Sequence, residues 1–247
     1  FNVLLFMIKS FLNRKFRKKF IDQNLEKDPN YNEPFVYFPI HVDMERPLLI
    51  MAPLFTNQIE IIRQVAKSLP MGLKLYVKET PAAVTRDWRP ISTYKEIMSI
   101  PNVTLIHPSV SAEKLMQNSS IVFTIAGTSG FEAAFYGKPS IVFSDVGYME
   151  LPSVSRVSEI EKLESIIKKS IKTKVNHVDL DKFVNYLESN IINFNWFEME
   201  SMIKEAFFFN GYTSDIEITE FQMKLFLEKN VQILNYVGKE YIKKMYK

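Results

Sequence analysis

Between residues 35 and 143 the chain alternates short unbroken apolar runs with stretches in which apolar residues recur at helical spacing. Unbroken runs rich in β-branched and aromatic residues are typical of strands that are buried on both faces of a parallel sheet. The stretches between them are typical of amphipathic helices. The pattern predicts strands at 35–40, 73–77, 102–106, 121–125 and 140–143, and helices at 57–68, 92–99, 112–118 and 131–136.

Strands and helices that alternate in this way, joined by right-handed crossovers, form an open α/β fold. We therefore expect a Rossmann-like, doubly wound parallel sheet in a domain at residues 35–155. A basic helix and a polar linker precede it at 1–34, and a lysine-rich helical region follows it at 156–247. Helices in that last region are expected at 158–171, 179–189, 197–209 and 219–246.

A turn of small residues joins the strand at 121–125 to the next helix. It contains Gly127, Thr128, Ser129 and Gly130. Glycine lets a ligand approach the backbone, and the N–H groups of a first helical turn attract anions. On this motif alone two hypotheses stay open. The turn holds a phosphate while Glu132 accepts bonds from a ribose or sugar hydroxyl, or the same residues form only a helix cap and its capping box.

Polar side chains also follow the first two strands, whose carboxyl ends lie at the same edge of the predicted sheet. His41, Glu45 and Arg46 follow the first strand, and Lys78, Arg86 and Arg89 follow the second. Cations there can neutralise a diphosphate or a sugar carboxylate. Each residue alone is explained as well by a strand-end histidine, a surface ion pair or a solvated loop. Because three strand exits share one edge, we favour a binding edge.

Composition narrows the classes of function. The 31 basic residues nearly match the 28 acidic ones, and a net charge of +3 does not favour nucleic-acid binding. The absence of cysteine excludes disulfides and thiolate metal sites and is consistent with a reducing compartment. The histidines are scattered, so no metal is expected. No apolar run approaches the length of a membrane span.

Residues 1–20 combine apolar residues at helical spacing with six basic residues. This predicts a basic amphipathic helix that either lies on an anionic membrane surface or packs against an amino-terminal domain. The chain starts at Phe1 rather than at a methionine. We therefore expect a carboxyl-terminal part of a longer protein, and this expectation favours the second alternative.

Four segments support a family resemblance when taken in order. They are Phe-Pro-Ile-His-Val-Asp-Met-Glu-Arg-Pro at 38–47, Leu-Tyr-Val-Lys-Glu-Thr-Pro at 75–81, Pro-Asn-Val-Thr-Leu-Ile-His-Pro at 101–108, and Thr-Ile-Ala-Gly-Thr-Ser-Gly-Phe-Glu-Ala at 124–133 followed by Gly-Lys-Pro. They resemble the capsular polysaccharide biosynthesis family, whose best-understood members are Kdo transferases with a GT-B architecture. The resemblance covers residues 35–152. It implies the donor-binding, carboxyl-terminal domain of a glycosyltransferase of surface polysaccharide synthesis.

The resemblance also implies a role for individual residues of the turn and of the cleft. Thr128, Ser129 and Gly130 match the turn that holds the donor phosphate, and Glu132 matches the acidic residue that follows it. His41 and Glu45 match polar positions at the first strand exit, where the donor meets the interdomain cleft.

The second strand exit departs from the family pattern. Lys78 and Glu79 match the start of a Lys-Glu-His-Pro segment, but Thr80 stands where the histidine would be. A threonine can donate a hydrogen bond but carries no charge. Lys78 or Arg86 would then have to neutralise the leaving nucleotide.

The implied reaction transfers a Kdo-like sugar from a nucleotide-activated donor, with CMP-sugar favoured, to a glycan or glycolipid acceptor. The base would come from the amino-terminal domain, so no catalytic residue is assigned, and no cofactor besides the nucleotide-sugar substrate is expected. The expected location is the cytoplasm, at the inner face of the membrane if residues 1–20 bind lipid. The alternatives are a non-catalytic nucleotide-sugar-binding module and a UDP-sugar epimerase of the same architecture.

Overall fold

The computed structural model describes residues 2–43, 45, 47–86, 88–208 and 217–245, without the side chains of 2–7 and 84–86. The chain divides into two compact units, Phe1–Phe183 and Val184–Lys247. Helix α7, His177–Asn190, runs from the first unit into the second.

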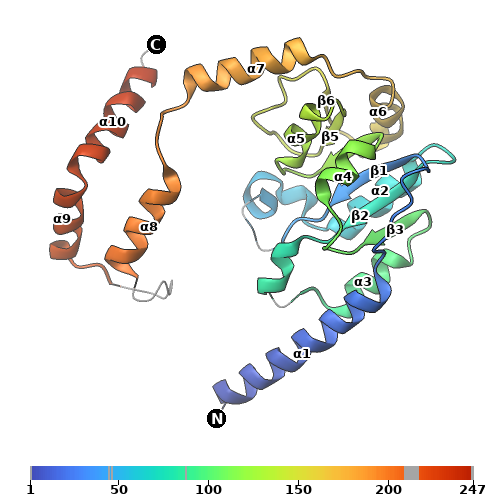
Figure 1. The fold of residues 1–247 in the computed structure, drawn as a ribbon, viewed down its shortest axis with the longest axis horizontal. Helices are drawn as coiled ribbons and strands as arrows, with labels where there is room; N and C mark the ends of the chain where they lie inside the picture. The colour runs from blue at the N-terminus through green and yellow to red at the C-terminus, as the bar shows by residue number, and fades with distance from the viewer. Residues whose placement is uncertain (1, 44, 46, 87, 209–216, 246–247) are drawn as a thin grey trace. The chain divides into compact units, whose positions relative to one another are not determined.

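The first unit contains a six-stranded, fully parallel sheet (Figure 1). Its strands are β1 Phe35–Pro39, β2 Lys74–Lys78, β3 Val103–Ile106, β4 Ile121–Thr124, β5 Ser140–Val142 and β6 Val154–Arg156. They lie in the order β3-β2-β1-β4-β5-β6, so the strand order reverses between β1 and β4. This is the order of a Rossmann sheet, in which ligands bind at the carboxyl ends of the strands beside the reversal. The predicted fold class is confirmed.

Helices cover both faces of the sheet. One face carries α2 Gln58–Ser68, α3 Ile91–Met98 and α6 Leu163–Ser170. The other face carries α4 Ala112–Asn118 and α5 Ser129–Phe135. Short helical turns lie in the loops: η1 Pro47–Met51, η2 Pro53–Phe55, η3 Pro81–Arg86 and η4 Ile160–Lys162.

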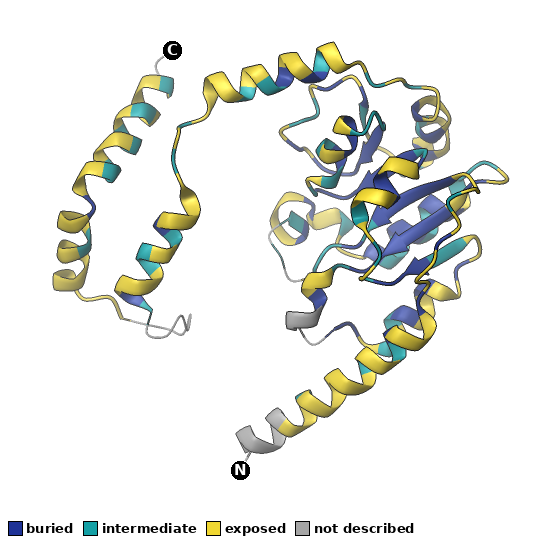
Figure 2. Cartoon of the chain, viewed as in Figure 1, coloured by how far each residue is buried: buried dark blue, intermediate teal, exposed yellow. Residues whose placement is uncertain are grey.

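Burial on both faces explains the unbroken apolar runs of the sequence. Along β1, Val36 and Phe38 pack into the core beneath α2 and α3, whereas Phe35 and Tyr37 pack into the core beneath α4 and α5. Figure 2 shows the strands as the most continuously buried part of the chain. A strand with one solvated face would show alternating polar residues instead.

Helix α1, Asn2–Asn24, joins the first unit only through its last turns. Ile21 is buried in the core, and the ring of Phe20 stacks on Tyr94 with centroids 6.4 Å apart. Asp22 accepts a 3.1 Å bond from His107 at the end of β3. The described residues before these turns are mostly exposed (Figure 2). None of the described helices has the length and apolarity needed to cross a bilayer.

The second unit contains α8 Trp196–Phe207, α9 Glu220–Lys229 and α10 Val231–Met245. Phe207 packs on Phe226 of α9 with ring centroids 5.0 Å apart. The single helix predicted at 219–246 is divided, because Asn230 leaves the helical conformation and its amide donates to the carbonyl of Phe226.

Two features of the first unit differ from the predicted pattern. Strand β6 was not predicted, because its three residues are only half-buried or exposed and form no apolar run. The loop after β1 contains the helical turns η1 and η2 instead of irregular chain.

Candidate functional site

The candidate site lies where the strand order reverses, between the carboxyl ends of β1 and β4. His41 follows β1, and its Nε2 lies 3.0 Å from the Oγ1 of Thr124, the last residue of β4. The same oxygen accepts a 3.0 Å bond from the N–H of Gly127. One buried hydroxyl therefore connects the first strand exit to the glycine turn.

The bonds of Thr124 determine which nitrogen of His41 carries the proton. Thr124 is fully buried, and the N–H of Gly127 donates to its oxygen. Among the described residues, His41 Nε2 is the acceptor within reach of its hydroxyl proton. Nε2 then accepts, and Nδ1 carries the proton of the neutral imidazole. Burial, followed by the charge of Arg89, lowers the pKa of His41 from 6.5 to about 4. His41 is thus an uncharged hydrogen-bond donor at neutral pH.

Side chains bond both main-chain polar groups of Gly127, whereas the main-chain N–H groups of the next three residues are not bonded by any described residue. The carbonyl of Gly127 accepts a bond from the Tyr148 hydroxyl, and its N–H is taken by Thr124. Among the described residues, the N–H groups of 128–130 have no acceptor. Three consecutive unpaired donors at the start of a helix form an anion-binding arrangement.

The capping-box alternative for this turn is wrong. Thr128 occupies the N-cap position of α5, but its side chain makes no bond to the helix backbone. Its hydroxyl donates instead to Glu132 at 2.6 Å. Thr128 and Glu132 are both exposed, so their oxygens are accessible to a ligand.

The two glycines of the turn are required by their neighbours. A Cβ on Gly127 would lie 2.6 Å from Cε1 of His41, and one on Gly130 would lie 2.6 Å from the hydroxyl of Tyr148. Both distances are shorter than real Cβ contacts, and neither glycine has positive φ. Close packing rather than backbone conformation therefore accounts for glycine here.

Lys78 ends β2 beside β1 and is 4% exposed. Among the described residues, its Nζ makes one long bond, 3.5 Å, to the carbonyl of Glu79. Burial lowers the pKa of Lys78, and the charge of Glu79 offsets only part of that effect. A buried ammonium that lacks strong acceptors attracts an anion.

Arg89, by contrast, is fully engaged by the protein. Its Nε donates to Glu79 at 2.9 Å, and its two terminal nitrogens donate to Asp43 and to the carbonyl of His41. Tyr94 also donates to Glu79, at 2.9 Å. Burial alone would lower the pKa of Arg89, but the charges of Glu79 and Asp43 outweigh it and raise that pKa.

These contacts change the role expected for Glu79. Its side chain has no exposed surface, because Arg89, Tyr94 and the N–H of Thr80 surround its oxygens. Contact with a donor, which the family resemblance implied, does not agree with that burial. Glu79 holds Arg89 instead, and Arg89 in turn holds the loop after β1.

The remaining predicted residues are distributed around the edge. Thr80 is half-buried beside Lys78, and Glu45 is half-buried in the loop after β1. Arg46 and the side chain of Arg86 lie outside the described residues. The structure therefore brings together His41, Lys78 and the turn at 127–132 at one sheet edge.

Sequence reasoning missed Thr124, Tyr148 and Gln58. Thr124 had a usable signal, since it is a polar residue in the apolar run of β4. Tyr148 and Gln58 reach the site from 21 and 17 residues away, so no local pattern marks them.

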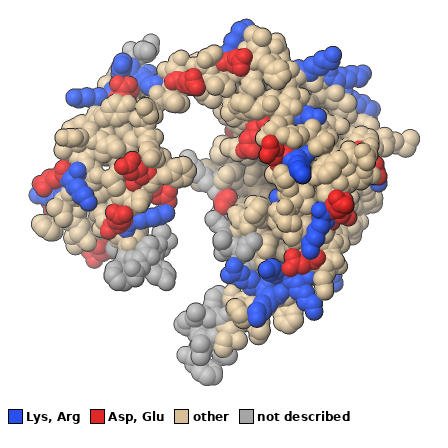
Figure 3. Space-filling view, in the orientation of Figure 1, with Lys and Arg blue, Asp and Glu red and all other residues tan. Residues whose placement is uncertain are grey.

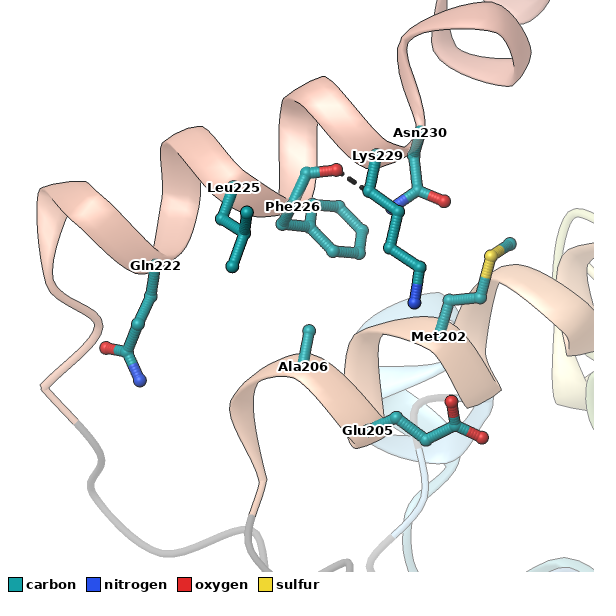
Figure 4. Close-up of a pocket in the computed structure, with 8 residues that line it drawn as sticks. All are labelled: Met202, Glu205, Ala206, Gln222, Leu225, Phe226, Lys229 and Asn230. Atoms are coloured by element: carbon teal, nitrogen blue, oxygen red, sulfur yellow. Dashed lines mark hydrogen bonds between the residues drawn. The ribbon is translucent and has the colours of Figure 1, made fainter.

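The second unit has a separate hollow of about 340 Å³ between α8 and α9 (Figure 4). Leu225 and Phe226 of α9 lie opposite Met202 and Ala206 of α8, and the side chain of Lys229 extends from α9 toward α8. None of its lining residues was predicted to bind a ligand.

Among the described residues there is no group of three His, Asp or Glu side chains suited to a metal ion.

The low pKa of His41 predicts a specific acid sensitivity. The unfolded imidazole gains its proton near pH 6.5, but the folded one only near 4, so the folded state loses stability as the pH falls through that interval. The loss amounts to about 3 kcal/mol at most. His41→Gln should remove this part of the pH dependence. Urea unfolding at about pH 7 and about pH 4.5 measures it.

The matched control is His177→Gln, at an exposed histidine on α7. The wild-type protein and the control should lose more free energy of unfolding on acidification than His41→Gln does. Equal losses in all three proteins would contradict the neutral, buried state of His41.

Comparisons with solved structures find partial likenesses. The chain resembles the β-Kdo 2,7 transferase KpsC of Thermosulfurimonas dismutans at 13% identity and a TM-score of 0.43, over 66% of this chain and 53% of that one. It resembles the UDP-GlcNAc 2-epimerase of Methanocaldococcus jannaschii at 15% identity and a TM-score of 0.44, over 71% of this chain and 50% of that one. The chain thus spans about half the length of these proteins. No curated protein sequence matches it.

A family model provides the decisive match. The model is described as capsule polysaccharide biosynthesis protein, and it matches residues 4–188. The matched range includes α1 except its first two residues, the whole sheet and every residue of the candidate site. Because the match covers well over half of the chain, the protein belongs to the capsule polysaccharide biosynthesis family.

Proposed function

We propose that this chain is the donor-binding part of a glycosyltransferase that builds capsular or other surface polysaccharide. The reaction transfers a Kdo-like sugar from a nucleotide-activated donor, with CMP-sugar favoured, to a glycan or glycolipid acceptor. The observation that carries the proposal is the row of three unpaired N–H groups at 128–130, placed where the strand order reverses. Membership of the family supplies the chemical context.

Each part of the site has a role in this proposal. The N–H groups of Thr128, Ser129 and Gly130 receive the donor phosphate, and Glu132 accepts hydrogen bonds from a ribose or sugar hydroxyl. Lys78 supplies the positive charge that stabilises the departing nucleotide. His41, neutral and protonated on Nδ1, donates a hydrogen bond without adding charge. The catalytic base lies outside these residues.

Two alternative functions would use the same site. A UDP-sugar epimerase would convert its donor with no acceptor present, so product analysis with the donor alone separates it from a transferase. A non-catalytic module would bind the nucleotide-sugar and leave it unchanged. The uncharged Thr80 is the feature that favours this second alternative.

Ser129→Asp should separate phosphate binding from helix stability. A carboxylate at the first turn of α5 interacts favourably with the helix dipole, so the thermal midpoint should stay equal or rise. The same charge would repel a phosphate on the free N–H groups and weaken nucleotide affinity about tenfold or more. Calorimetric titration with CMP, UDP and GDP, together with thermal unfolding, measures both effects.

Ser129→Asn is the matched control, since it has similar volume and no charge. It should bind nucleotide more tightly than the aspartate variant. Unchanged affinity in Ser129→Asp would place the phosphate elsewhere. A preference for UDP over CMP in the wild-type protein would move the epimerase ahead of the CMP-sugar transferase.

Lys78→Met is expected to stabilise the fold and weaken binding. The lowered pKa of Lys78 means that its charged form is less favourable in the folded protein than in the unfolded chain, and methionine removes that cost. The thermal midpoint should rise, while nucleotide affinity should fall because the cation is lost. Lys74→Met, at an exposed position of the same strand, controls for the change of residue type. A variant that is less stable and binds normally would show that Lys78 serves the fold alone.

We also propose that α1 contacts an anionic membrane surface. Its exposed residues include Phe11 at 57% and Phe16 at 64%, together with Lys15, Lys18 and Lys19. Residues 1–21 contain no acidic side chain. Figure 3 shows the basic side chains gathered over this end of the molecule. The uncompensated basic charge of α1 and its exposed aromatic side chains support attraction to an anionic bilayer. The predicted amphipathic character of this helix is wrong, because its apolar and polar residues are not segregated on opposite faces.

Sedimentation with lipid vesicles tests this contact. The protein should sediment with phosphatidylglycerol-containing vesicles and not with pure phosphatidylcholine, and high salt should release it. Replacing Lys15, Lys18 and Lys19 by Glu should abolish the binding. Replacing Lys168, Lys169 and Lys172, exposed lysines in and beside α6, gives the matched control. Absence of binding to anionic vesicles would favour packing of α1 on another protein domain.

A further inference from the structure

The main chain of His41 is held by a side chain where strand pairing ends. Strand β1 pairs with β2 as far as Pro39, and the last ladder bond runs from the N–H of Ile40 to the carbonyl of Lys78. At His41, the side-chain amide of Gln58 replaces the missing strand. The N–H of His41 donates to Gln58 Oε1 at 2.8 Å, and Gln58 Nε2 donates to the carbonyl of His41 at 2.8 Å.

The helix does not need a glutamine at this position. Gln58 is the first residue of α2, and the helix is already capped by Asn57, whose side chain accepts from the N–H of Glu60. Gln58 is nevertheless 4% exposed, and its second amide proton goes to Asp43 at 2.6 Å. Burying an amide costs free energy unless every bond is satisfied. The side-chain bonds of Gln58 all go to residues of the loop after β1.

The main-chain position of His41 sets the place of its ring at the turn. The ring lies 3.0 Å from Thr124 Oγ1 and so close to Gly127 that no Cβ fits between them. A small displacement of the His41 backbone would therefore either break the bond to Thr124 or press on the turn.

We infer that Gln58 is a positioning residue, which holds His41 against Thr124 and the turn at 127–130 so that the ring and the free N–H groups face one ligand. The inference rests on the proposed function for the identity of that ligand, the phosphate of a nucleotide. The contact between Gln58 and His41 can be tested without any ligand.

The pKa of His41 is the quantity to measure, and it depends on the charged groups around this residue. Arg89 donates to its carbonyl, Asp43 lies on the far side of Gln58 and Arg89, and Glu79 lies behind Arg89. From the β4 side, the contacts are the uncharged Thr124 and Gly127. Loosening the His41 loop would expose the ring to water and move its pKa back toward 6.5.

The experiment uses the full chain and NMR of the histidine rings. In Gln58→Leu the pKa of His41 should rise by about one pH unit or more. Affinity for CMP, or for whichever nucleotide the wild-type protein binds, should fall roughly tenfold. Gln64→Leu is the control, since Gln64 lies on the same helix and its amide donates to Glu60 instead of His41. An unchanged His41 titration in folded Gln58→Leu would overturn the inference.

A second variant and a measurement on the wild-type protein cover the case in which Gln58→Leu does not fold. Gln58→Glu keeps the acceptor for the His41 N–H but loses both donors, so it should also shift the His41 titration. In the wild-type protein the side-chain amide protons of Gln58 should exchange with water more slowly than those of Gln64. Equal exchange rates would overturn the inference. If the wild-type protein binds no nucleotide, the proposed function fails, but the His41 and Gln58 measurements still decide the positioning role.

Discussion

The carboxyl edge of the sheet depends on the buried guanidinium of Arg89. Its three bonds join the end of β2, through Glu79, to the loop after β1, through Asp43 and the carbonyl of His41. An ion pair taken out of water gains little net stability, but removing one partner leaves an uncompensated charge and costs about 3–5 kcal/mol. The two loops are therefore held together. The candidate site is built on this fixed frame.

Arg89 and Lys78 differ in how well the protein compensates their positive charges. Both cations are buried, but within the described part of the chain Arg89 has two carboxylate partners and Lys78 has one distant carbonyl. The pKa of Arg89 is accordingly raised, and that of Lys78 is lowered. A fold selected only for stability would gain from replacing Lys78 by an apolar residue.

The sequence was sufficient to predict strands β1 to β5, because their apolar residues form unbroken runs and the helices between them have one apolar stripe. The predicted strand at 121–125 and helix at 112–118 agree with β4 and α4 to within one residue. Strand β6 was missed because it lies at the edge of the sheet and is not fully buried. The break at Asn230 depends on one side-chain bond, which helical periodicity does not reveal.

The location of the candidate site could be predicted from the sequence, but the contacts between its residues could not. Parallel strands bring their carboxyl ends to one edge, so His41 and the glycine turn could be placed together from the strand pattern alone. The bond between His41 and Thr124 joins residues 83 positions apart, and Arg89 reaches His41 from 48 positions away. Glu79 was expected to touch a ligand because it matches the start of the Lys-Glu-His-Pro segment of the family. Only the tertiary packing of Arg89 and Tyr94 shows that it is buried.

The turn itself shows how the fold prepares these donors before a ligand arrives. Thr124 accepts a bond from the N–H of Gly127, and Tyr148 donates to its carbonyl, so side chains hold both main-chain polar groups of this residue. Thr128 donates to Glu132 instead of capping the helix, and the N–H groups of 128–130 stay unpaired. Their orientation is fixed by neighbours rather than by the ligand, which lowers the entropic cost of binding. The close packing of His41 against Gly127 ties the position of the imidazole to that of the turn.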